Sequence, residues 1–289
     1  MESNSFANGV EECMARPTVL AIGGLDPSGG AGLVVDTAAA RAVGAHGAAV
    51  IAVSTVQSGL GFFGATLSPA SAVIASADAV LAAHDVRAVK TGALGSAAVV
   101  SAVATLAARP GFPPVVIDPV FASTTGGALV DASGRYALRD LLIPLAAIVT
   151  PNTIEAAVLS GEPVAAVDDM LRAAARILEL GCAAVLVKGG HLAGSEVVDV
   201  FADQSGRRCV FRETRVGSRE VRGTGCALAS MIAGHLALGR DLETAVALSR
   251  SALRRAISAA YAVGEGPRVL DFGGPQLPRL DRPGERRES

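Results

Sequence analysis

The sequence predicts a three-layer α/β fold, with a mostly parallel central sheet, helices on both faces and a small β-hairpin late in the chain. Two observations lead to this prediction. Short runs rich in Val and Ile alternate with Ala-rich stretches of helical length, as in successive βαβ units. The runs are apolar along their whole length, which is typical of parallel strands covered on both faces.

The predicted elements follow in order along the chain. Strands are expected over 18–24, 48–56, 86–92, 114–120, 146–152 and 183–190. Helices are expected over 34–43, 69–84, 96–108, 167–181, 223–238 and 241–263. The segment 197–216 breaks the alternation and predicts the hairpin, with Ser205 and Gly206 at its turn. We therefore expect one domain over 17–273, between flexible end segments 1–16 and 274–289.

Composition excludes several classes of protein. The chain has 289 residues, of which 51% are hydrophobic and 18% charged, so it can bury a core and shows no sign of disorder. A net charge of -2 argues against a nucleic-acid partner. The uncharged interval between Arg41 and Asp78 is broken by Gly, Pro, Ser and Thr, which argues against a membrane span. Four cysteines without metal spacing, and an acidic N-terminal segment unlike a signal peptide, favour a reducing, cytoplasmic location.

The six predicted parallel strands share a feature at their ends. Each runs into a glycine-rich or polar motif, in chain order GGLDPSGGAG, TVQSG, KTGALG, DPV, TPNTIE and KGGH. Ligands of an open α/β sheet bind beyond the carboxyl ends of its strands. Glycine turns alone explain any one of these motifs, but they explain all six poorly, so we expect the motifs to gather around one site.

The motif GTGC (223–226) predicts a glycine turn that enters a helix. The chain lacks the GxxxxGK[ST] pattern of Walker-type nucleotide sites. Free N–H groups at a helix start favour anions, so GTGC is a candidate phosphate site. A thiol in this position, four residues after Arg222, is expected to have a lowered pKa and to act as a base toward a substrate hydroxyl. An ordinary helix start is the alternative.

These motifs resemble those of the hydroxymethylpyrimidine/phosphomethylpyrimidine kinases of thiamine biosynthesis, in the ribokinase-like superfamily. The resemblance covers roughly 18–272 and rests on AIGGLDPSGGAGLVVD, VTPNTIEA, VLVKGGH and GTGC, in matching order and spacing. It implies an ATP- and Mg2+-dependent kinase. The expected substrates are 4-amino-5-hydroxymethyl-2-methylpyrimidine and then its monophosphate. It also implies a homodimer.

The resemblance assigns roles to individual residues. Cys226 matches the base, and the N–H groups of Gly223, Thr224 and Gly225 match an anion hole. The expected substrate-binding residues are Gly24, Asp36, Gln57 and Ala93. The expected nucleotide-binding residues are Asn152 and Lys188, and the expected magnesium ligands are Asp118 and Glu155. His191 also matches the family, with either a structural or a catalytic role.

Several positions depart from the family pattern, among them the loop TTGGALVD after DPV, which lacks an acidic residue often present there. Ala93 stands where a methionine that contacts the pyrimidine is common, which predicts a wider pocket. Ser58 replaces a frequent asparagine. Arg222 replaces a histidine, and its extra positive charge is expected to lower the thiol pKa further. Two other readings stay open: a pyridoxal or pyridoxine kinase that uses the wider pocket, and a pyrimidine sensor without turnover.

Overall fold

The computed structural model describes residues 15–123, 126–190, 192–217 and 220–273. Within them, one nine-stranded sheet runs through the molecule in the order β3-β2-β1-β4-β5-β6-β7-β8-β9. The strands are β1 (Thr18–Leu25), β2 (His46–Ser58), β3 (Gly61–Leu67), β4 (Val86–Thr91), β5 (Val115–Ile117), β6 (Ile148–Val149), β7 (Ala184–Val187), β8 (Glu196–Asp203) and β9 (Arg208–Thr214). Strands β2, β1, β4, β5, β6 and β7 are parallel.

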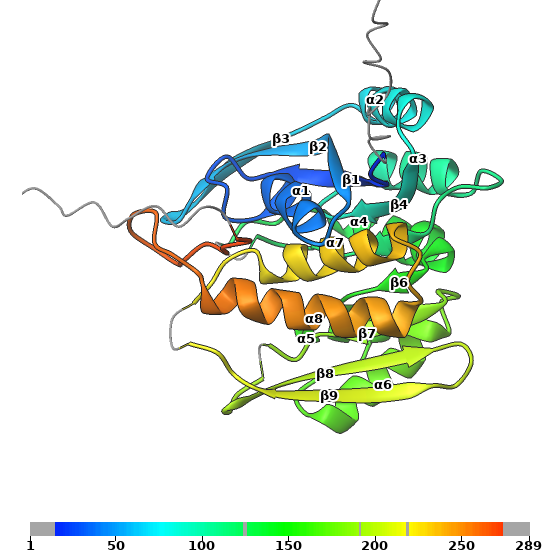
Figure 1. Ribbon diagram of the computed structural model, residues 1–289. Helices are drawn as coiled ribbons and strands as arrows, with labels where there is room; N and C mark the ends of the chain where they lie inside the picture. The colour runs from blue at the N-terminus through cyan, green and yellow to red at the C-terminus, as the bar shows by residue number, and fades with distance from the viewer. Residues whose placement is uncertain (1–14, 124–125, 191, 218–219, 274–289) are drawn as a thin grey trace, which may run out of the picture.

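Helices cover both faces of this sheet (Figure 1). On one face lie α1 (Gly32–Ala42), α7 (Thr224–Ala237) and α8 (Leu242–Ser258). The other helical elements are α2 (Ala70–Ala83), α3 (Ala97–Ala107), α4 (Ala132–Ala137), α5 (Thr153–Ser160), α6 (Val167–Leu178), a π-helical turn η1 (Leu138–Leu142) and a 3-10 turn η2 (Ile143–Leu145). The fold is therefore the three-layer α/β arrangement that the sequence predicts.

Side-chain alternation along the strands explains why these strands are apolar throughout. In β1, Val19 belongs to a buried cluster that includes residues of α7 and α8, whereas Leu20 and Ile22 belong to another cluster that includes residues of α2, α3 and α6. Successive strand residues point to opposite faces, and here each face meets a helical layer. Both sides of the central strands are thus buried. Because both faces of the central strands are buried against helices, polar side chains are found mainly at the strand ends.

The hairpin expected over 197–216 is present as β8 and β9, and it extends the main sheet through an antiparallel pairing of β8 with β7. One strand, β3, and the helical elements α4, α5, η1 and η2 were not predicted. Strand β3 pairs antiparallel with β2 at the opposite edge, and α5 begins directly after β6. The sequence of β3, GFFGATL, carries two glycines and faces solvent along most of its length, so it lacks the pattern of a buried strand. The last helix ends at Ser258, earlier than expected.

The predicted flexible tail 274–289 lies outside the described residues, as do His191 and most of the segment 1–16. Among the described residues, no helix has both the length and the apolar character that a bilayer crossing requires.

Candidate active site

A cavity of about 690 Å3 opens at the carboxyl ends of the parallel strands. All six strand-end motifs contribute to its lining, through Gly24, Gln57, Ala93, Asp118, Asn152 and Lys188 among others. The start of α7 lines the same cavity, through its N-cap Gly223 and through Thr224, Gly225 and Cys226 of its first turn. Every predicted site residue therefore lines this cavity, including Asp36 and Glu155.

The turn that carries Cys226 depends on two glycines. Gly223 has a φ of 75°, and a Cβ there would lie 2.5 Å from the Gly30 carbonyl oxygen. A Cβ on Gly225 would lie 3.1 Å from Lys188 Nζ. A residue other than glycine would strain the backbone at the first position and crowd the lysine at the second. The first N–H groups of α7 have no partner within the helix, so they are available to an anion beside Lys188.

The expected ionisation of Cys226 is wrong for this structure. Burial raises the pKa of the Cys226 thiol to about 12, and the nearby carboxylates of Asp36 and Asp118 raise it further, whereas Lys90 lowers it. The sulfur therefore carries its proton at neutral pH. Burial and the two carboxylates outweigh the helix N-terminus here, because both act against the formation of a second negative charge.

Arg222 does not contribute the charge that was expected near the thiol. Its Nη2 atom donates to Asp26 Oδ2 at 3.1 Å, and its Nη1 atom donates to the Ser58 carbonyl oxygen at 3.0 Å. The side chains of Arg222 and Asp26 are only 3% and 1% exposed. The guanidinium is thus a partner of the loop after β1, and sequence proximity to Cys226 did not reveal this.

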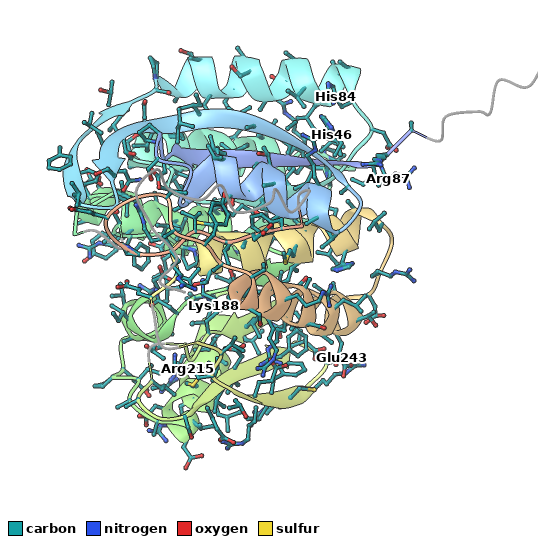
Figure 2. The ribbon with its side chains drawn as sticks, turned by 60° about the vertical axis from the view of Figure 1, so that its left-hand side comes forward. His46, His84, Arg87, Lys188, Arg215 and Glu243 are labelled. Carbon is teal, nitrogen blue, oxygen red and sulfur yellow. The ribbon has the colours of Figure 1, made fainter. Side chains whose placement is uncertain are left out.

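Lys188 and Asp118 form an ion pair beside the turn. Lys188 Nζ donates to Asp118 Oδ1 at 2.7 Å. Burial alone would lower the pKa of Lys188, but Asp118 and Glu155 hold it above its usual value, so the amine is charged. In Figure 2, Lys188 and Arg215 lie toward one end of the strands and His46 and His84 toward the other. A fixed positive charge therefore stands where the phosphate-binding turn opens.

Asn152 and Glu155 form a capping box at the start of α5. The Asn152 side chain accepts from the Ile154 and Glu155 N–H groups, and Glu155 Oε2 accepts from the Asn152 N–H at 2.7 Å. This arrangement holds both side chains in the cavity wall. It also means that the two residues stabilise the helix whether or not they bind a ligand.

Burial raises the pKa of Glu155 to about 7; Asp118 raises it further, whereas Lys188 lowers it. Among the described residues, no group of three or more His, Cys, Asp or Glu side chains converges as a metal site. The available donor set is two buried carboxylates, Asp118 and Glu155. This set fits Mg2+, which commonly uses one or two carboxylates and completes its shell with water and substrate phosphate.

Asp36, an expected substrate-binding residue, already has two hydrogen-bond partners inside the protein. Lys90 Nζ and Ser230 Oγ each lie 2.8 Å from Asp36 Oδ1. The second oxygen, Oδ2, is buried and has no hydrogen-bond partner among the described residues. Because Asp36 lines the cavity, this oxygen is an acceptor available to a ligand that donates an N–H.

Lys90 is a cavity residue that the sequence reasoning missed. It is fully buried, and although burial would lower its pKa, Asp36 holds the pKa above the usual value. The rarity of lysine in the sequence could have pointed to this residue. Lys90 and Lys188 are the two lysines of the chain, which otherwise uses arginine, and both line the cavity.

Gln57, Gly24 and Ala93 surround the same part of the cavity as Asp36. Gln57 Oε1 accepts from Ser123 Oγ at 2.9 Å and from Arg222 Nη2 at 3.4 Å. A Cβ on Gly24 would stand 3.4 Å from the Ala93 Cβ, so both positions leave room only because their side chains are small.

A second part of the cavity was not predicted at all. It is lined by the ends of β8 and β9 and by α8, including Val197, Val216, Leu253, Ile257 and Arg250. Arg250 is buried and pairs with Asp199 at 2.8 Å, and Asp199 also accepts from the Gly189 N–H at 3.0 Å. This network fixes the loop that follows Lys188. Its members are distant in sequence, so no motif marks it.

The geometry agrees with comparisons to known proteins. The family model described as phosphomethylpyrimidine kinase matches residues 26–271. The hydroxymethylpyrimidine/phosphomethylpyrimidine kinase of Streptomyces coelicolor is 40% identical over 257 residues, covering 89% of this chain and 94% of the relative. A structure of phosphomethylpyrimidine kinase from Clostridium difficile is 34% identical with a TM-score of 0.74, covering 84% of this chain and 100% of that one. An ADP complex of Bacillus subtilis pyridoxal kinase is 26% identical with a TM-score of 0.81, covering 89% and 98%.

Proposed function

Because the chain belongs to the phosphomethylpyrimidine kinase family, we propose that it phosphorylates 4-amino-5-hydroxymethyl-2-methylpyrimidine with ATP, and then phosphorylates the monophosphate to the diphosphate, in thiamine biosynthesis. The observation that carries this proposal is the convergence of Asp36, Lys188 and Cys226 on one cavity. A ring-binding carboxylate, a phosphate-binding lysine and a proton acceptor are the groups that this reaction requires.

The pyrimidine is recognised on the side of Asp36 and Gln57. The free Oδ2 atom of Asp36 accepts an N–H from the aminopyrimidine, and Gly24 and Ala93 leave space for the ring. A buried acceptor left without a donor penalises a ring that lacks the amino group. The hydroxymethyl group then points toward Cys226 at the start of α7.

The transfer forms a bond between the hydroxymethyl oxygen and the terminal phosphorus of ATP, and it breaks the bond from that phosphorus to the bridging oxygen of ADP. The hydroxyl proton passes to the Cys226 sulfur. The N–H groups of Gly223, Thr224 and Gly225 and the charge of Lys188 stabilise the transferred group. Positioning and charge neutralisation supply most of the rate in reactions of this kind.

Since the thiol pKa is about 12, the proton acceptor is the scarce thiolate form. This form is a strong base, and its amount rises with pH.

The second part of the cavity, with apolar residues of β8 and α8, accommodates the nucleoside of ATP. Asn152 and Lys188 bind its phosphates. Asp118 and Glu155 would hold Mg2+, which neutralises phosphate charge when bound.

A substrate panel tests the proposal. Wild-type protein is incubated with ATP, Mg2+ and either the pyrimidine alcohol, its monophosphate or pyridoxal, and nucleotide consumption is followed. We expect turnover of both pyrimidines at a higher kcat/KM than pyridoxal. Faster turnover of pyridoxal would overturn the substrate assignment. Calorimetric binding of the pyrimidine without any ATP consumption would instead identify a sensor.

We also propose a homodimer in the cytoplasm. The edge hairpin of β2 and β3 exposes Val56, Leu60 and Phe63, which are 60%, 71% and 69% accessible. These exposed apolar side chains, from β2, from the turn and from the edge strand β3, favour pairing of this edge with a second copy. Sedimentation of wild type and Phe63→Glu tests the dimer: a monomeric wild type would overturn it.

Cys182, Cys209 and Cys226 are free thiols, in keeping with a reducing compartment. Cell fractionation tests the proposed cytoplasmic location.

A further inference from the structure

Arg222 joins three loops on the substrate side of the cavity. From the turn before α7, its guanidinium reaches Asp26 in the loop after β1, and it reaches both the Ser58 carbonyl and Gln57 Oε1 at the end of β2. Arg222 itself lines the cavity and is 3% exposed. No other charged group among the described residues makes direct contacts to both of these loops.

The ion pair with Asp26 is built into the loop. Asp26 Oδ1 accepts from the Ser28 N–H at 2.9 Å and from Ser28 Oγ at 2.7 Å, which leaves Oδ2 for Arg222 at 3.1 Å. Two charges removed from water are costly, and a buried pair is weak evidence for a stabilising role alone. Its fork geometry, with bonds in several directions, is better suited to fixing the loops relative to each other.

The contact with Arg222 sets the orientation of the Gln57 side-chain amide, with the amide oxygen toward Arg222 and Ser123. Both Arg222 and Ser123 donate to Gln57 Oε1. Turning the amide over would place its NH2 group against the Arg222 guanidinium, which can only donate, whereas the Ser123 hydroxyl could accept from it; Arg222 is therefore the neighbour that selects this orientation. A side chain that distinguishes ring donors from ring acceptors needs such an orientation before the ligand arrives.

The backbone of Arg222 is held independently of its side chain. The Arg222 N–H donates to the Arg268 carbonyl oxygen at 2.9 Å, and the next residue, Gly223, packs directly against Gly30. A change in the guanidinium is therefore expected to alter the substrate side of the cavity while the turn before Cys226 keeps its place.

We propose that Arg222 is a positioning residue for pyrimidine recognition: it orients Gln57 and holds the loop 26–30 against the end of β2. This inference rests on the proposed function, because it takes the pyrimidine ring as the ligand that Gln57 contacts. It adds a specificity role for a residue that lies on the cavity wall and is expected to have no direct part in phosphoryl transfer.

The test compares Arg222→Lys and Arg222→Ala with wild type. Lysine keeps a charge opposite Asp26, but its single nitrogen lacks the planar fork with which Arg222 reaches Asp26, Ser58 and Gln57 from two nitrogen atoms. For both variants we expect the KM for the pyrimidine to rise about tenfold or more, the loss typical of a charge-assisted hydrogen bond. The KM for ATP should stay within about twofold, because the nucleotide side of the cavity is held by other residues.

Chemical rescue provides a second readout. Guanidinium ion, added well below denaturing concentrations, should lower the pyrimidine KM of Arg222→Ala, since the vacated position opens on the cavity. Arg109→Lys is the matched control, because Arg109 pairs with Asp78 at the surface and should leave all constants unchanged. Thermal unfolding verifies that each variant is folded. If Arg222→Ala does not fold, the kinetics of Arg222→Lys alone test the positioning role.

Equal increases in both KM values, a fall in kcat alone, or unchanged constants in Arg222→Lys would overturn the proposal. Failure of the proposed function has a different signature, since wild type itself would then not phosphorylate the pyrimidine. In that case, loss of pyrimidine binding by calorimetry in Arg222→Lys would still support the positioning role, and unchanged binding would refute it.

Discussion

Lys90 Nζ donates to Asp36 Oδ1 across 2.8 Å, with both side chains 1% exposed, one from the end of β4 and the other from the middle of α1. The pair joins the sheet to the helical layer that carries Cys226. The other oxygen of Asp36, a residue of the cavity wall, is buried and has no hydrogen-bond partner among the described residues. A single carboxylate thus serves both the packing of the fold and the proposed recognition of substrate.

Lys90→Met should destabilise the protein by about 3–5 kcal/mol, because Asp36 loses its ion-pair partner in the interior. Burial already raises the pKa of Asp36 and Lys90 lowers it, so without Lys90 the carboxyl must either stay charged without compensation or take up a proton. The double variant Lys90→Met, Asp36→Asn should recover part of this loss, since the buried charge is then gone. Urea unfolding at pH 7 measures both. Simple additivity of the two single changes would contradict a direct pairing.

Asp36→Asn tests the recognition role of the same carboxylate, and thermal unfolding verifies that the variant is folded although its pairing with Lys90 is weakened. Its activity toward the pyrimidine should fall by about tenfold or more, while the KM for ATP changes little. Steady-state kinetics with each substrate varied provides the measurement. An unchanged pyrimidine KM would remove Asp36 from the ring-binding site.

Cys226→Ala should lower kcat by about 100-fold or more, as expected for loss of a general base. In wild type, kcat/KM for the pyrimidine should rise about tenfold per pH unit through neutrality, because thiolate is the minor form below the thiol pKa of about 12. In Cys226→Ala this pH dependence should disappear. Cys209→Ala, which removes a half-buried thiol of β9, is the control and should behave as wild type. A flat wild-type profile would refute the base assignment.

Glu155→Gln should stabilise the protein above neutral pH and not at pH 4. The Glu155 pKa is about 7 in the folded protein, against an ordinary value of 4.5, so the folded state binds more protons between these values. Stability from this group is therefore lost as pH rises from about 4.5 to 7. Glutamine retains the capping box and avoids the buried charge, which predicts a gain of up to about 3 kcal/mol at pH 8.

Urea unfolding at pH 4 and pH 8 measures this effect, with Glu162→Gln as a control because Glu162 is 40% exposed. The same variant should lose kinase activity if Glu155 supports Mg2+. A gain in stability that is equal at both pH values would show that the charge of Glu155 is not its cause.

Ala93→Met should narrow the pocket beside Gly24. A Cβ built on Gly24 would already lie at contact distance from the Ala93 Cβ, so a longer side chain at position 93 fills the space that Gly24 leaves. We expect kcat/KM for pyridoxal to fall by about tenfold or more relative to the pyrimidine alcohol, in line with the effect of small volume changes in apolar pockets. Leu94→Met is the matched control, because Leu94 packs in the core beside the pocket. Equal ratios in wild type and Ala93→Met would show that this position does not control specificity.

The motifs at the strand ends predicted where the cavity lies, because apolar runs and their polar ends can be read from short stretches of sequence. Apolar runs specify parallel strands, and the polar ends of parallel strands must meet at one edge of the sheet. This is why Asp118, Asn152, Lys188 and the turn before Cys226 meet as expected. By contrast, β3 escaped prediction because an exposed edge strand has no burial pattern to detect.

The sequence by itself determined the layers, the edge at which the site forms and the family to which the chain belongs. Only the tertiary structure decided what surrounds each charge. Arg222 stands four residues before Cys226 and yet pairs with Asp26, while Lys90 reaches Asp36 across 54 positions. The thiol pKa consequently rises, where local spacing predicted a fall. Ionisation depends on burial and on charges nearby in space, and neither is a property of sequence distance.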